Sequence, residues 1–405
     1  MIKIAVLGYG TVGSGVVEVI EKNRDMVNKK AGEDLEIKYI LDLRDFSGDP
    51  YEDKVIHDFG QILADEEIKI ICETMGGVGA AYEYTKQALS AGKSVCTSNK
   101  ELVASHGPEL LALAKKNSCN YLFEASVGGG IPIIRPLNYS LTAERIEAVT
   151  GILNGTTNYI LSKMENEGAD YELVLKEAQE KGYAERNPED DVEGYDACRK
   201  IAILSSLMTG KNVDYRKIYT EGISKVEPRD FIYAKLLGMS IKLLAVSREV
   251  GEETLAMVSP FLINVTHPLH MVNGVFNAVF VKGNMLGDSM YYGRGAGKLP
   301  TASAVVSDVI DCARHIGKVI MCFWDAEEAR LQNIDQVKRQ FFFRVKAGSE
   351  EKVKLLFGEG LKEVKHPEIV DECGFITPVM AEKAFEDIYS QLAGETVGRR
   401  LRLEA

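Results

Sequence analysis

The chain has 405 residues, of which 45% are hydrophobic and 27% charged, with 37 Gly and 11 Pro. That length exceeds what one hydrophobic core usually serves, so two or three domains are expected, and the balanced composition excludes a collagen-like or disordered chain. The formal net charge of -12 argues against nucleic acid or an anionic membrane as a partner, while a local basic pocket for a phosphorylated cofactor remains compatible with it.

The cysteines and the start of the chain predict a cytoplasmic protein. Seven cysteines lie far apart with no C-x-x-C pair, which is typical of buried free thiols in a reducing compartment. The sequence enters a predicted strand at once, without a basic and then apolar leader, so no signal peptide is expected. No apolar run approaches about 18 residues, so no membrane-spanning helix is expected either.

The first 140 residues alternate between strand and helix patterns. Apolar, β-rich runs lie at Ile2–Leu7, Ile37–Leu41, Ile68–Cys72, Ser94–Thr97 and Tyr121–Phe123. Helical patterns between them lie at Gly15–Lys22, Ala80–Ala91 and Pro108–Lys116. Such alternation implies right-handed crossovers and a parallel, doubly wound α/β sheet.

A glycine-rich turn follows the first strand and reads Gly8-Tyr9-Gly10-Thr11-Val12-Gly13. Gly8 permits the tight turn, Gly10 lets backbone approach a pyrophosphate, and Gly13 allows close packing of helix on strand. The helix that follows offers unpaired N–H groups and a positive dipole end to the phosphates. The turn, with Thr11 and Val12, therefore predicts a Rossmann domain that binds NAD or NADP.

The end of the second strand bears on the choice of dinucleotide. Asp42 suits the ribose hydroxyls of NAD, whereas Arg44, two residues later, suits the 2′-phosphate of NADP. The two side chains favour opposite cofactors, and both also fit an ordinary solvated loop. The sequence leaves NAD and NADP as alternatives.

From about Arg145 the pattern predicts a second, α+β domain around an open sheet. Its expected elements are a strand at Arg145–Leu153, helices at Tyr159–Met164, Tyr171–Lys181 and Asp196–Met208, and a later strand at Asn277–Val281. The long helix expected at Thr301–Lys318 packs back on the first domain, and the polar stretch Trp324–Gln336 resembles a linker. The last segment, from Phe341, indicates a small module of strands and helices. We therefore expect domains at 1–140 (completed by 301–318), 141–300 and 338–405.

Asp196 and Lys200 are four residues apart on one predicted helix, so their side chains share a face. Glu185 and Asp191 lie just upstream, which gives three carboxylates around one lysine. Oxidation of an alcohol by hydride transfer needs a group that accepts the hydroxyl proton, and carboxylates can bind a cationic group of a substrate. The alternative for such a pair is an exposed salt bridge on a solvated helix.

Other chemistries have little support. His267 and His270 flank a probable turn and lack the spacing of a zinc motif, so a coincidental pair is expected. No cysteine can be matched with a histidine as a catalytic nucleophile. Phe341, Phe342 and Phe343 are expected in a hydrophobic core.

Several motifs together resemble the homoserine dehydrogenase family. The glycine turn is followed by Thr97-Ser98-Asn99-Lys100, and further similar blocks lie at Phe123–Pro132, Gly151–Tyr159, Lys181–Glu185, Asp190–Lys200 and Tyr292–Ala302. They cover the chain from its start to about residue 318. The resemblance implies NAD(P)-dependent interconversion of L-homoserine and L-aspartate 4-semialdehyde, in the biosynthesis of threonine, methionine and isoleucine.

The resemblance also implies residue roles. Lys200 would exchange the proton at the substrate oxygen, preferably through a water, because carboxylates nearby raise a lysine's pKa. Lys100 would lie beside the nicotinamide and the substrate, Glu185 would bind the substrate's amino group, and Asp191 and Asp196 would orient substrate and lysine. One departure is visible, because Asn187 stands where the family commonly has an acidic residue.

Further family contacts concern the cofactor and a cation. Gly76, Ser98 and Gly297 are implied to contact the dinucleotide. Carbonyl oxygens near the end of the first domain would bind a monovalent cation such as sodium, for which oxygen ligands are suited. The residues that would supply these carbonyls are Glu124, Val127, Gly129 and Ile131. The alternative is a glycine-rich turn that lets the chain pass close to the cofactor.

The C-terminal segment resembles an ACT domain, a βαββαβ amino-acid-sensing fold often appended to this family. The usual Asp-x-Pro-Gly turn after the first strand is absent, and Val345–Glu350 stands in its place. Threonine feedback, a structural role and a dimerising role all remain open for this module.

The expected partners are small-molecule substrates and further copies of the chain, as a homodimer or homotetramer. Two other functions are compatible with parts of the sequence. One is a Rossmann dehydrogenase acting on another amino-acid-derived alcohol. The other is a catalytically silent, nucleotide-binding regulator, which the presence of Lys100 and Lys200 disfavours.

Overall fold

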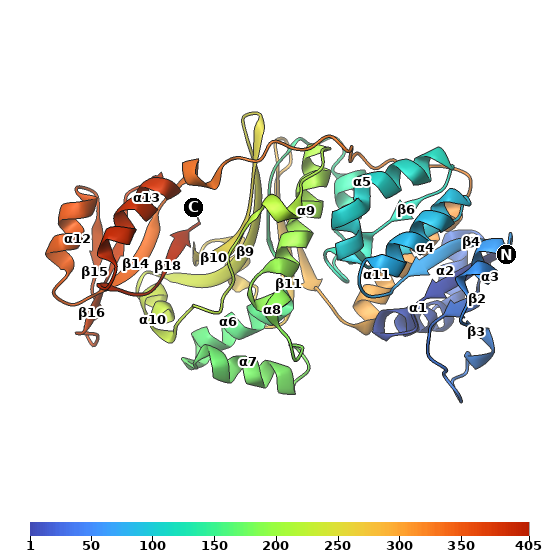
Figure 1. The fold of residues 1–405 in the computed structure, drawn as a ribbon, viewed down its shortest axis with the longest axis horizontal. Coiled ribbons are helices and arrows are strands. Elements are labelled where there is room, and N and C mark those ends of the chain that lie inside the picture. Colours follow the sequence, from blue (N-terminus) through green and yellow to red (C-terminus); the bar gives the residue numbers. More distant parts are fainter. Residues whose placement is uncertain (405) are drawn as a thin grey trace.

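The computed structural model describes residues 1–404, and three parts follow one another along its long axis. The N-terminal part, the middle part and the C-terminal part appear from right to left in Figure 1. No helix among the described residues is long and apolar enough to cross a membrane. The seven cysteines are free, and all but the half-buried Cys322 are buried.

The N-terminal part is built on a parallel six-stranded sheet. Its strand order is β3-β2-β1-β4-β5-β6, and every pair within it is parallel. The order reverses beside β1, which is the point where doubly wound sheets bind their ligands. This confirms the predicted Rossmann-type α/β sheet. Its strands are β1 (Ile2–Leu7), β2 (Leu35–Leu41), β3 (Val55–Ile56), β4 (Ile68–Glu73), β5 (Ser94–Thr97) and β6 (Tyr121–Leu122).

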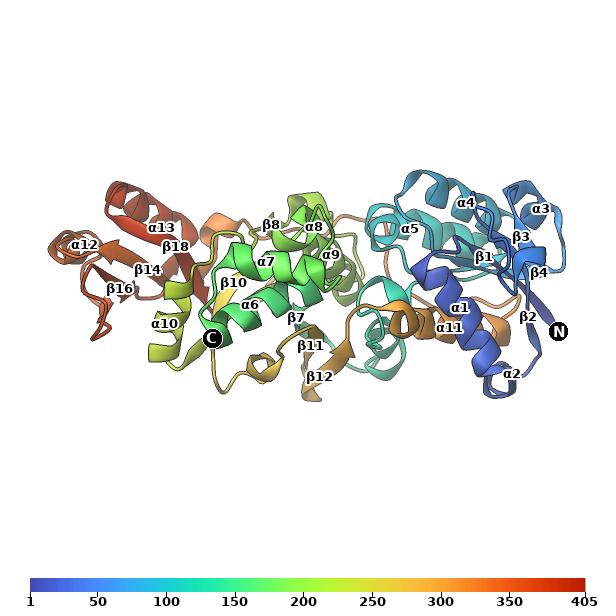
Figure 2. The same ribbon diagram turned by 90° about the horizontal axis from the view of Figure 1, so that it is seen from below.

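Helices cover both faces of this sheet (Figure 2). They are α1 (Thr11–Lys22), α2 (Arg24–Ala31), α3 (Phe59–Ala64), α4 (Gly79–Ser90), α5 (Lys100–Lys116) and, from much later in the chain, α11 (Lys298–Arg314). Helix α11 packs against α1 so closely that a Cβ at Gly15 would come within 2.9 Å of the Ala302 Cβ. The expected return of a late helix to the first sheet is therefore observed. The helix itself starts three residues earlier and ends four earlier than the predicted 301–318.

Helix α5 begins at Lys100, eight residues before the predicted start at Pro108. Proline is favoured in the first turn of a helix, and the sequence pattern therefore predicted a helix that starts at Pro108. The observed N-cap is Asn99, whose side-chain oxygen accepts a hydrogen bond from the Leu102 N–H at 3.0 Å. Pro108 lies inside the helix instead. The early start places Lys100 directly after the carboxyl end of β5.

The middle part contains the larger, mixed sheet. Its order is β12-β11-β7-β9-β10-β18-β14-β16-β15, with β8 also pairing with β10. The strands contributed by the middle part are β7 (Ile146–Ile152), β8 (Tyr219–Thr220), β9 (Met239–Val250), β10 (Glu253–Asn264), β11 (Phe276–Gly283) and β12 (Gly287–Arg294). The helices are α6 (Gly155–Glu167), α7 (Tyr171–Glu180), α8 (Glu189–Val192), α9 (Tyr195–Thr209) and α10 (Pro228–Leu236).

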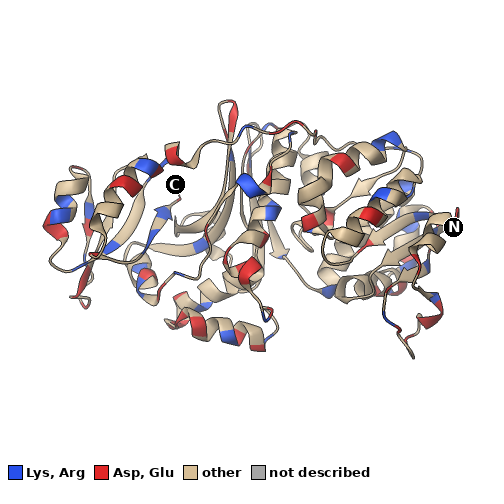
Figure 3. Ribbon diagram, in the orientation of Figure 1, with Lys and Arg blue, Asp and Glu red and all other residues tan. Residues whose placement is uncertain are grey.

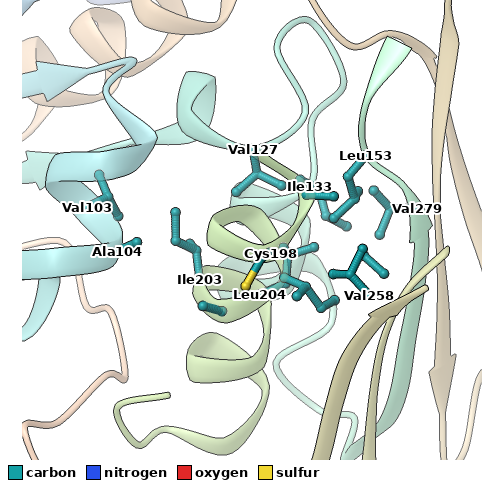
Figure 4. Close-up of a cluster of buried hydrophobic side chains, with 14 of the residues drawn as sticks. Val103, Ala104, Val127, Ile133, Leu153, Cys198, Ile203, Leu204, Val258 and Val279 are labelled. Carbon is teal, nitrogen blue, oxygen red and sulfur yellow. The ribbon is translucent and has the colours of Figure 1, made fainter. Parts of the chain in front are cut away.

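Helix α9 joins the two parts through its hydrophobic faces (Figure 4). On one side Ile203 points towards Val103 and Ala104 of α5. On the other side Leu204 lies near Val258 of the mixed sheet. Because the packing is continuous, the helix that carries Asp196 and Lys200 is fixed against the helix that carries Lys100.

The C-terminal segment has the expected order of strands and helices. It runs β14 (Phe341–Lys346), α12 (Glu350–Phe357), β15 (Lys362–Val364), β16 (Glu372–Ile376), α13 (Glu382–Tyr389) and β18 (Thr396–Leu403). Phe341, Phe342 and Phe343 are fully buried, as predicted. The segment shares its sheet with the middle part, because β18 pairs in parallel with β10 through Phe261–Arg402 and Leu262–Leu403.

The linker to this segment is held along most of its length. Trp324 is buried against α5, where a Cβ at Gly107 would come within 2.7 Å of the indole. Isolated bridges then join Asn212 to Glu328 and Thr254 to Leu331. The remaining short elements are the strands β13 (Lys338–Arg339) and β17 (Met380–Ala381) and the turns of helix at Glu52–Lys54, Glu124–Ser126, Pro136–Ser140, Tyr215–Lys217, Pro268–Met271, Ile334–Gln336 and Ser390–Leu392.

Candidate functional site

The glycine turn after β1 has the geometry of a dinucleotide cradle. Gly8 has a φ of +87°, a left-handed conformation that favours glycine. A Cβ at Gly13 would lie 1.8 Å from the Gly8 carbonyl oxygen, so only glycine fits beneath the turn. A Cβ at Gly10 would meet nothing within 4 Å, which leaves the backbone of the α1 N-cap open to a ligand. The turn therefore fits a pyrophosphate at the start of α1, beside Thr11 and Val12.

Asp42 lies at the end of β2, next to this turn. Its carboxylate accepts a hydrogen bond from the Tyr9 N–H at 2.8 Å and forms an ion pair with the Arg44 guanidinium at 2.9 Å. Hydrogen bonding to Arg44, together with the Tyr9 N–H, holds the pKa of Asp42 well below its usual range, against the effect of burial. The two residues that favour opposite cofactors are thus bound to each other.

Gly76 and Ser98, also expected at the cofactor, lie at the same edge of the sheet. Gly76 follows β4, Ser98 follows β5, and Gly297, with a φ of +123°, is the N-cap of α11. A Cβ at Gly76 would meet nothing within 4 Å. Carboxyl ends of parallel strands are where open α/β sheets bind ligands, so Gly76 and Ser98 lie at the edge where a dinucleotide would bind.

Two lysines meet at one buried carboxylate. The Asp196 Oδ2 atom lies 2.7 Å from the Lys200 Nζ, and its Oδ1 atom lies 2.7 Å from the Lys100 Nζ. The side chain of Asp196 is only 4% exposed, that of Lys200 11% and that of Lys100 39%. The surface salt bridge considered as an alternative is therefore not what is observed. Lys200 also donates to the Leu153 carbonyl at 2.8 Å.

This cluster differs from the three carboxylates around one lysine that the sequence predicts. Asp191 is close to it and half-buried, but Glu185 is exposed, and none of the side-chain hydrogen bonds or ion pairs found in residues 1–404 involves its carboxylate. The physical reason is that Glu185 lies in the loop after α7, whereas Asp191 and Asp196 are held on α8 and α9. The second cation comes from α5, because that helix starts at Lys100.

Asn154 is a site residue that sequence reasoning missed. Its amide nitrogen donates to Asp191 Oδ1 at 2.7 Å and to Asp196 Oδ2 at 2.9 Å, while its oxygen accepts from the Thr157 N–H and caps α6. An asparagine before a predicted helix is a sequence signal for an N-cap. That signal gives no hint of two carboxylates supplied by later helices.

The surroundings of the cluster shift the pKa values of Asp196 and Asp191 in opposite directions. Burial disfavours the ionised form of Asp196, yet Lys200 and Lys100 outweigh it and hold its pKa well below the usual range. Burial and the charge of Asp196 raise the pKa of Asp191, although the Asn154 amide opposes this. Burial acts to lower the pKa of Lys100, but Asp196 prevails and raises it. The site therefore contains one firmly ionised acid and one whose ionisation is sensitive to its neighbours.

The proposed cation loop lies near the N-terminus of α11. The Glu124 carboxylate accepts backbone N–H groups of Ile133, Ile134 and Arg135 at 2.6 to 2.9 Å, so its side chain is already engaged. In residues 1–404, no side-chain hydrogen bond and no backbone hydrogen bond outside helices and strands uses the carbonyls of Glu124, Val127, Gly129 or Ile131. Backbone carbonyl oxygens are suited to a hard cation.

The parallel sheet, the glycine cradle and the lysine–aspartate cluster beside it define an NAD(P)-dependent oxidoreductase. The family model described as homoserine dehydrogenase, NAD binding domain, matches residues 8–124, and that described as homoserine dehydrogenase matches residues 132–310. The chain belongs to the homoserine dehydrogenase family.

Individual relatives agree with this assignment. The homoserine dehydrogenase of Bacillus subtilis (strain 168) is 38% identical over 96% of this chain and 94% of its own length. The crystal structure of a homoserine dehydrogenase from Thiobacillus denitrificans superposes with a TM-score of 0.92 at 35% identity, over 100% of this chain and 98% of that one. A hyperthermophilic archaeal homoserine dehydrogenase in complex with NADPH gives a TM-score of 0.64 at 28% identity, over 77% and 97% of the chains.

Proposed function

We propose that Lys200 and Lys100, both paired with Asp196, catalyse the interconversion of L-homoserine and L-aspartate 4-semialdehyde. The observation that supports this most is the single buried carboxylate with an ammonium group 2.7 Å from each oxygen, beside the cofactor edge of the parallel sheet. Such an arrangement suits an oxygen that gains and loses a proton while its carbon exchanges a hydride. The bound dinucleotide supplies the hydride acceptor or donor.

The roles of the residues follow from their charges. The Lys200 ammonium, which lies 2.7 Å from the Asp196 carboxylate, donates a proton through a water to the oxygen of the aldehyde as it becomes an alcohol. In the opposite direction the same water returns the hydroxyl proton to the neutral Lys200 amine, because the reverse reaction follows the same path. Glu185 and Asp191 bind the ammonium group of the substrate.

We propose that both NAD and NADP are accepted, with Asp42 and Arg44 in competing roles. Asp42 takes the ribose hydroxyls of NAD, and Arg44 leaves Asp42 to pair with the 2′-phosphate of NADP. The 62% exposed side chain of Arg44 leaves it free to make this change. Gly8, Gly10, Thr11, Val12 and Gly13 would hold the pyrophosphate. Gly76, Ser98 and Gly297 would also contact the dinucleotide, and Lys100 would lie beside the nicotinamide.

We propose that the carbonyls of Glu124, Val127, Gly129 and Ile131 bind sodium. A cation there would stabilise the loop that lies against the Gly295 and Arg294 backbone, since the Gly130 N–H donates to the Arg294 carbonyl at 3.1 Å. The cation would thus act on the segment that leads to Gly297 and the cofactor. Its role is in shaping the site.

The remaining proposals concern assembly and regulation. We infer a cytoplasmic homodimer or homotetramer with small-molecule substrates, without nucleic acid or membrane as partners. The division at 1–140 with 301–318, 141–300 and 338–405 is retained as our domain proposal. The module at 338–405 resembles an ACT domain in its βαββαβ order.

The test is turnover of L-homoserine with NAD or NADP, followed at the absorbance of the reduced cofactor. The wild-type protein is expected to oxidise L-homoserine. The kcat of Lys200→Ala is expected to be at least about 100-fold lower, because the substitution removes the proton donor. Lys211→Ala, at an exposed lysine outside the site, is the matched control and should keep full activity. Turnover of a different amino-acid-derived alcohol, with none of homoserine, would refute the substrate assignment.

A further inference from the structure

Three arginines of the last strand converge on one glutamate of the middle part. Glu221, directly after β8, forms ion pairs with Arg399, Arg400 at 3.0 Å and Arg402 at 2.5 Å. These arginines belong to β18, which appears blue beside the C-terminus in Figure 3. Burial opposes the charge of Glu221, yet the arginines prevail and lower its pKa to about 2. Glu221 therefore stays ionised, and its ion pairs with Arg399, Arg400 and Arg402, here called the tie, join the last strand to the middle part.

The tie continues into the backbone behind the site. Arg399 also donates to the Gly222 carbonyl at 2.7 Å, and the Ile223 N–H donates to the Val192 carbonyl at 2.8 Å. A Cβ at Gly222 would lie 2.2 Å from that same Val192 oxygen, so the two segments touch without space for a side chain. A Cβ at Gly194 would in turn lie 3.3 Å from the Thr220 side chain.

Val192 to Gly194 is the joint between α8 and α9. Asp191 precedes this joint by one residue, and Asp196 follows it by two. The orientation of the two carboxylates relative to each other therefore depends on the segment that holds the joint, which is Glu221–Ile223. That segment is held in turn by the arginines of β18.

We propose that Glu221 is a positioning residue, through which strand β18 sets the geometry of the substrate carboxylate Asp191. The proposal rests on the proposed role of Asp191 in binding the substrate ammonium. A displacement of the α8–α9 joint would move Asp191 and leave the cofactor edge of the parallel sheet in place, because β1, β4 and β5 lie in the other sheet. Loss of the tie therefore weakens homoserine binding selectively.

The same junction contains a second group of charges that serves as a comparison. Arg344 of β14 pairs with Asp230 of α10 and with Glu372 of β16, both at 2.9 Å. These residues join the C-terminal segment to the middle part and make no contact with the α8–α9 joint among the hydrogen bonds and ion pairs found in residues 1–404. Attachment of the segment is thus separable from positioning of Asp191.

The experiment compares steady-state kinetics of full-length wild type, Glu221→Gln and Glu386→Gln. Glu386 of α13 pairs with Arg400 at 2.6 Å and does not reach the joint, which makes its neutral variant the matched control. We expect Glu221→Gln to raise KM for homoserine about 10-fold or more, with KM for the dinucleotide changed by less than about 2-fold. Glu386→Gln should match wild type in both constants.

A second variant guards against simple unfolding of the first. Gly222→Ala keeps every charge and pushes the Val192 carbonyl away, so it should raise KM for homoserine in the same selective way. Equal changes in KM for both substrates, or wild-type constants in both variants, would overturn the proposal. Absence of homoserine turnover in wild type would instead refute the proposed function, and Asp191→Asn without any rise in KM would refute the assignment of Asp191.

Discussion

At the scale of single residues, the amide of Asn154 balances two carboxylates that repel each other. It donates to Asp191 and to Asp196, and only Asp196 has its charge compensated directly by two lysines. Burial and Asp196 both raise the pKa of Asp191, whereas this amide, together with the charges of Lys200 and Lys100, favours its ionised form. The affinity of the site for a cationic substrate is thus tied to a residue that carries no charge.

Asn154→Ser tests this balance. Serine still caps α6, but it cannot donate to both carboxylates, so the pKa of Asp191 should rise further. Because the ionised acid binds substrate, the acidic limb of kcat/KM for homoserine should move to higher pH by about one unit. A uniform fall at every pH, without movement of that limb, would mean that Asn154 acts only as a helix cap.

A second prediction at this scale concerns the choice of dinucleotide by Asp42 and Arg44. Asp42→Ala should lower kcat/KM with NAD about 10-fold more than with NADP, because the ribose hydroxyls lose their acceptor. Arg44→Ala should do the reverse, since the 2′-phosphate loses its charge partner. The measurement is kcat/KM with each dinucleotide at saturating homoserine. Parallel losses with both cofactors would contradict the proposed division of roles.

At the scale of elements, helix α5 is central because three features meet on it. Its N-terminus carries Lys100, its middle packs on α9, and Gly107 receives the indole of Trp324 from the linker. The linker is thereby docked on the helix whose first residue enters the site. The linker Trp324–Gln336 is polar in sequence, yet its packing on α5 helps to fix the N-terminal part against the middle part.

Gly107→Ala should lower the free energy of unfolding by about 1 kcal/mol. Alanine favours a helix over glycine by about 1 kcal/mol, but a Cβ within 2.7 Å of a buried indole overpacks the contact at a cost of about 1–3 kcal/mol. Denaturant unfolding of the single and double variants measures this. In a Trp324→Leu background the same change should stabilise, and equal effects in both backgrounds would contradict the docking argument.

Features encoded locally were predicted from the sequence, whereas those that depend on distant segments were not. The strand, glycine turn and helix at the start of the chain are consecutive, so their pattern predicted the cradle. The i,i+4 spacing likewise predicted the Asp196–Lys200 pair. Asn154 joined the site, and Glu185 stayed outside the cluster, because tertiary packing brings α6, α8 and α9 together. The start of α5 was missed because Pro108 imitates a helix start.

At the scale of the whole molecule, the C-terminal segment is attached by buried charges. Arg344 is fully buried and lies among Asp230, Glu372 and Glu227. Pairs of this kind contribute little net stability, yet the loss of one partner leaves carboxylates uncompensated. The junction is therefore specific, and it is vulnerable to the loss of a single guanidinium.

Arg344→Met should cost about 3–5 kcal/mol of unfolding free energy near neutral pH. The uncompensated carboxylates would then have folded-state pKa values above those of the unfolded chain. Stability is lost as pH rises above the unfolded values, so the deficit should shrink below about pH 5. Thermal unfolding at acidic and neutral pH measures it, with Arg216→Met, at an exposed arginine, as a control expected within about 0.5 kcal/mol. A deficit independent of pH would contradict this account.

The pairing of β10 with β18 also has a consequence for the synthesis of this protein on the ribosome. The ribosome delivers β10 long before β18, so the growing chain presents part of an unpaired strand edge until its last strand emerges. Unpaired edges recruit other strands, and a nascent chain is exposed to such encounters while translation continues. Chaperones that shield this edge, or a pause in translation before β18, would therefore decide how much of the newly made protein reaches its native state.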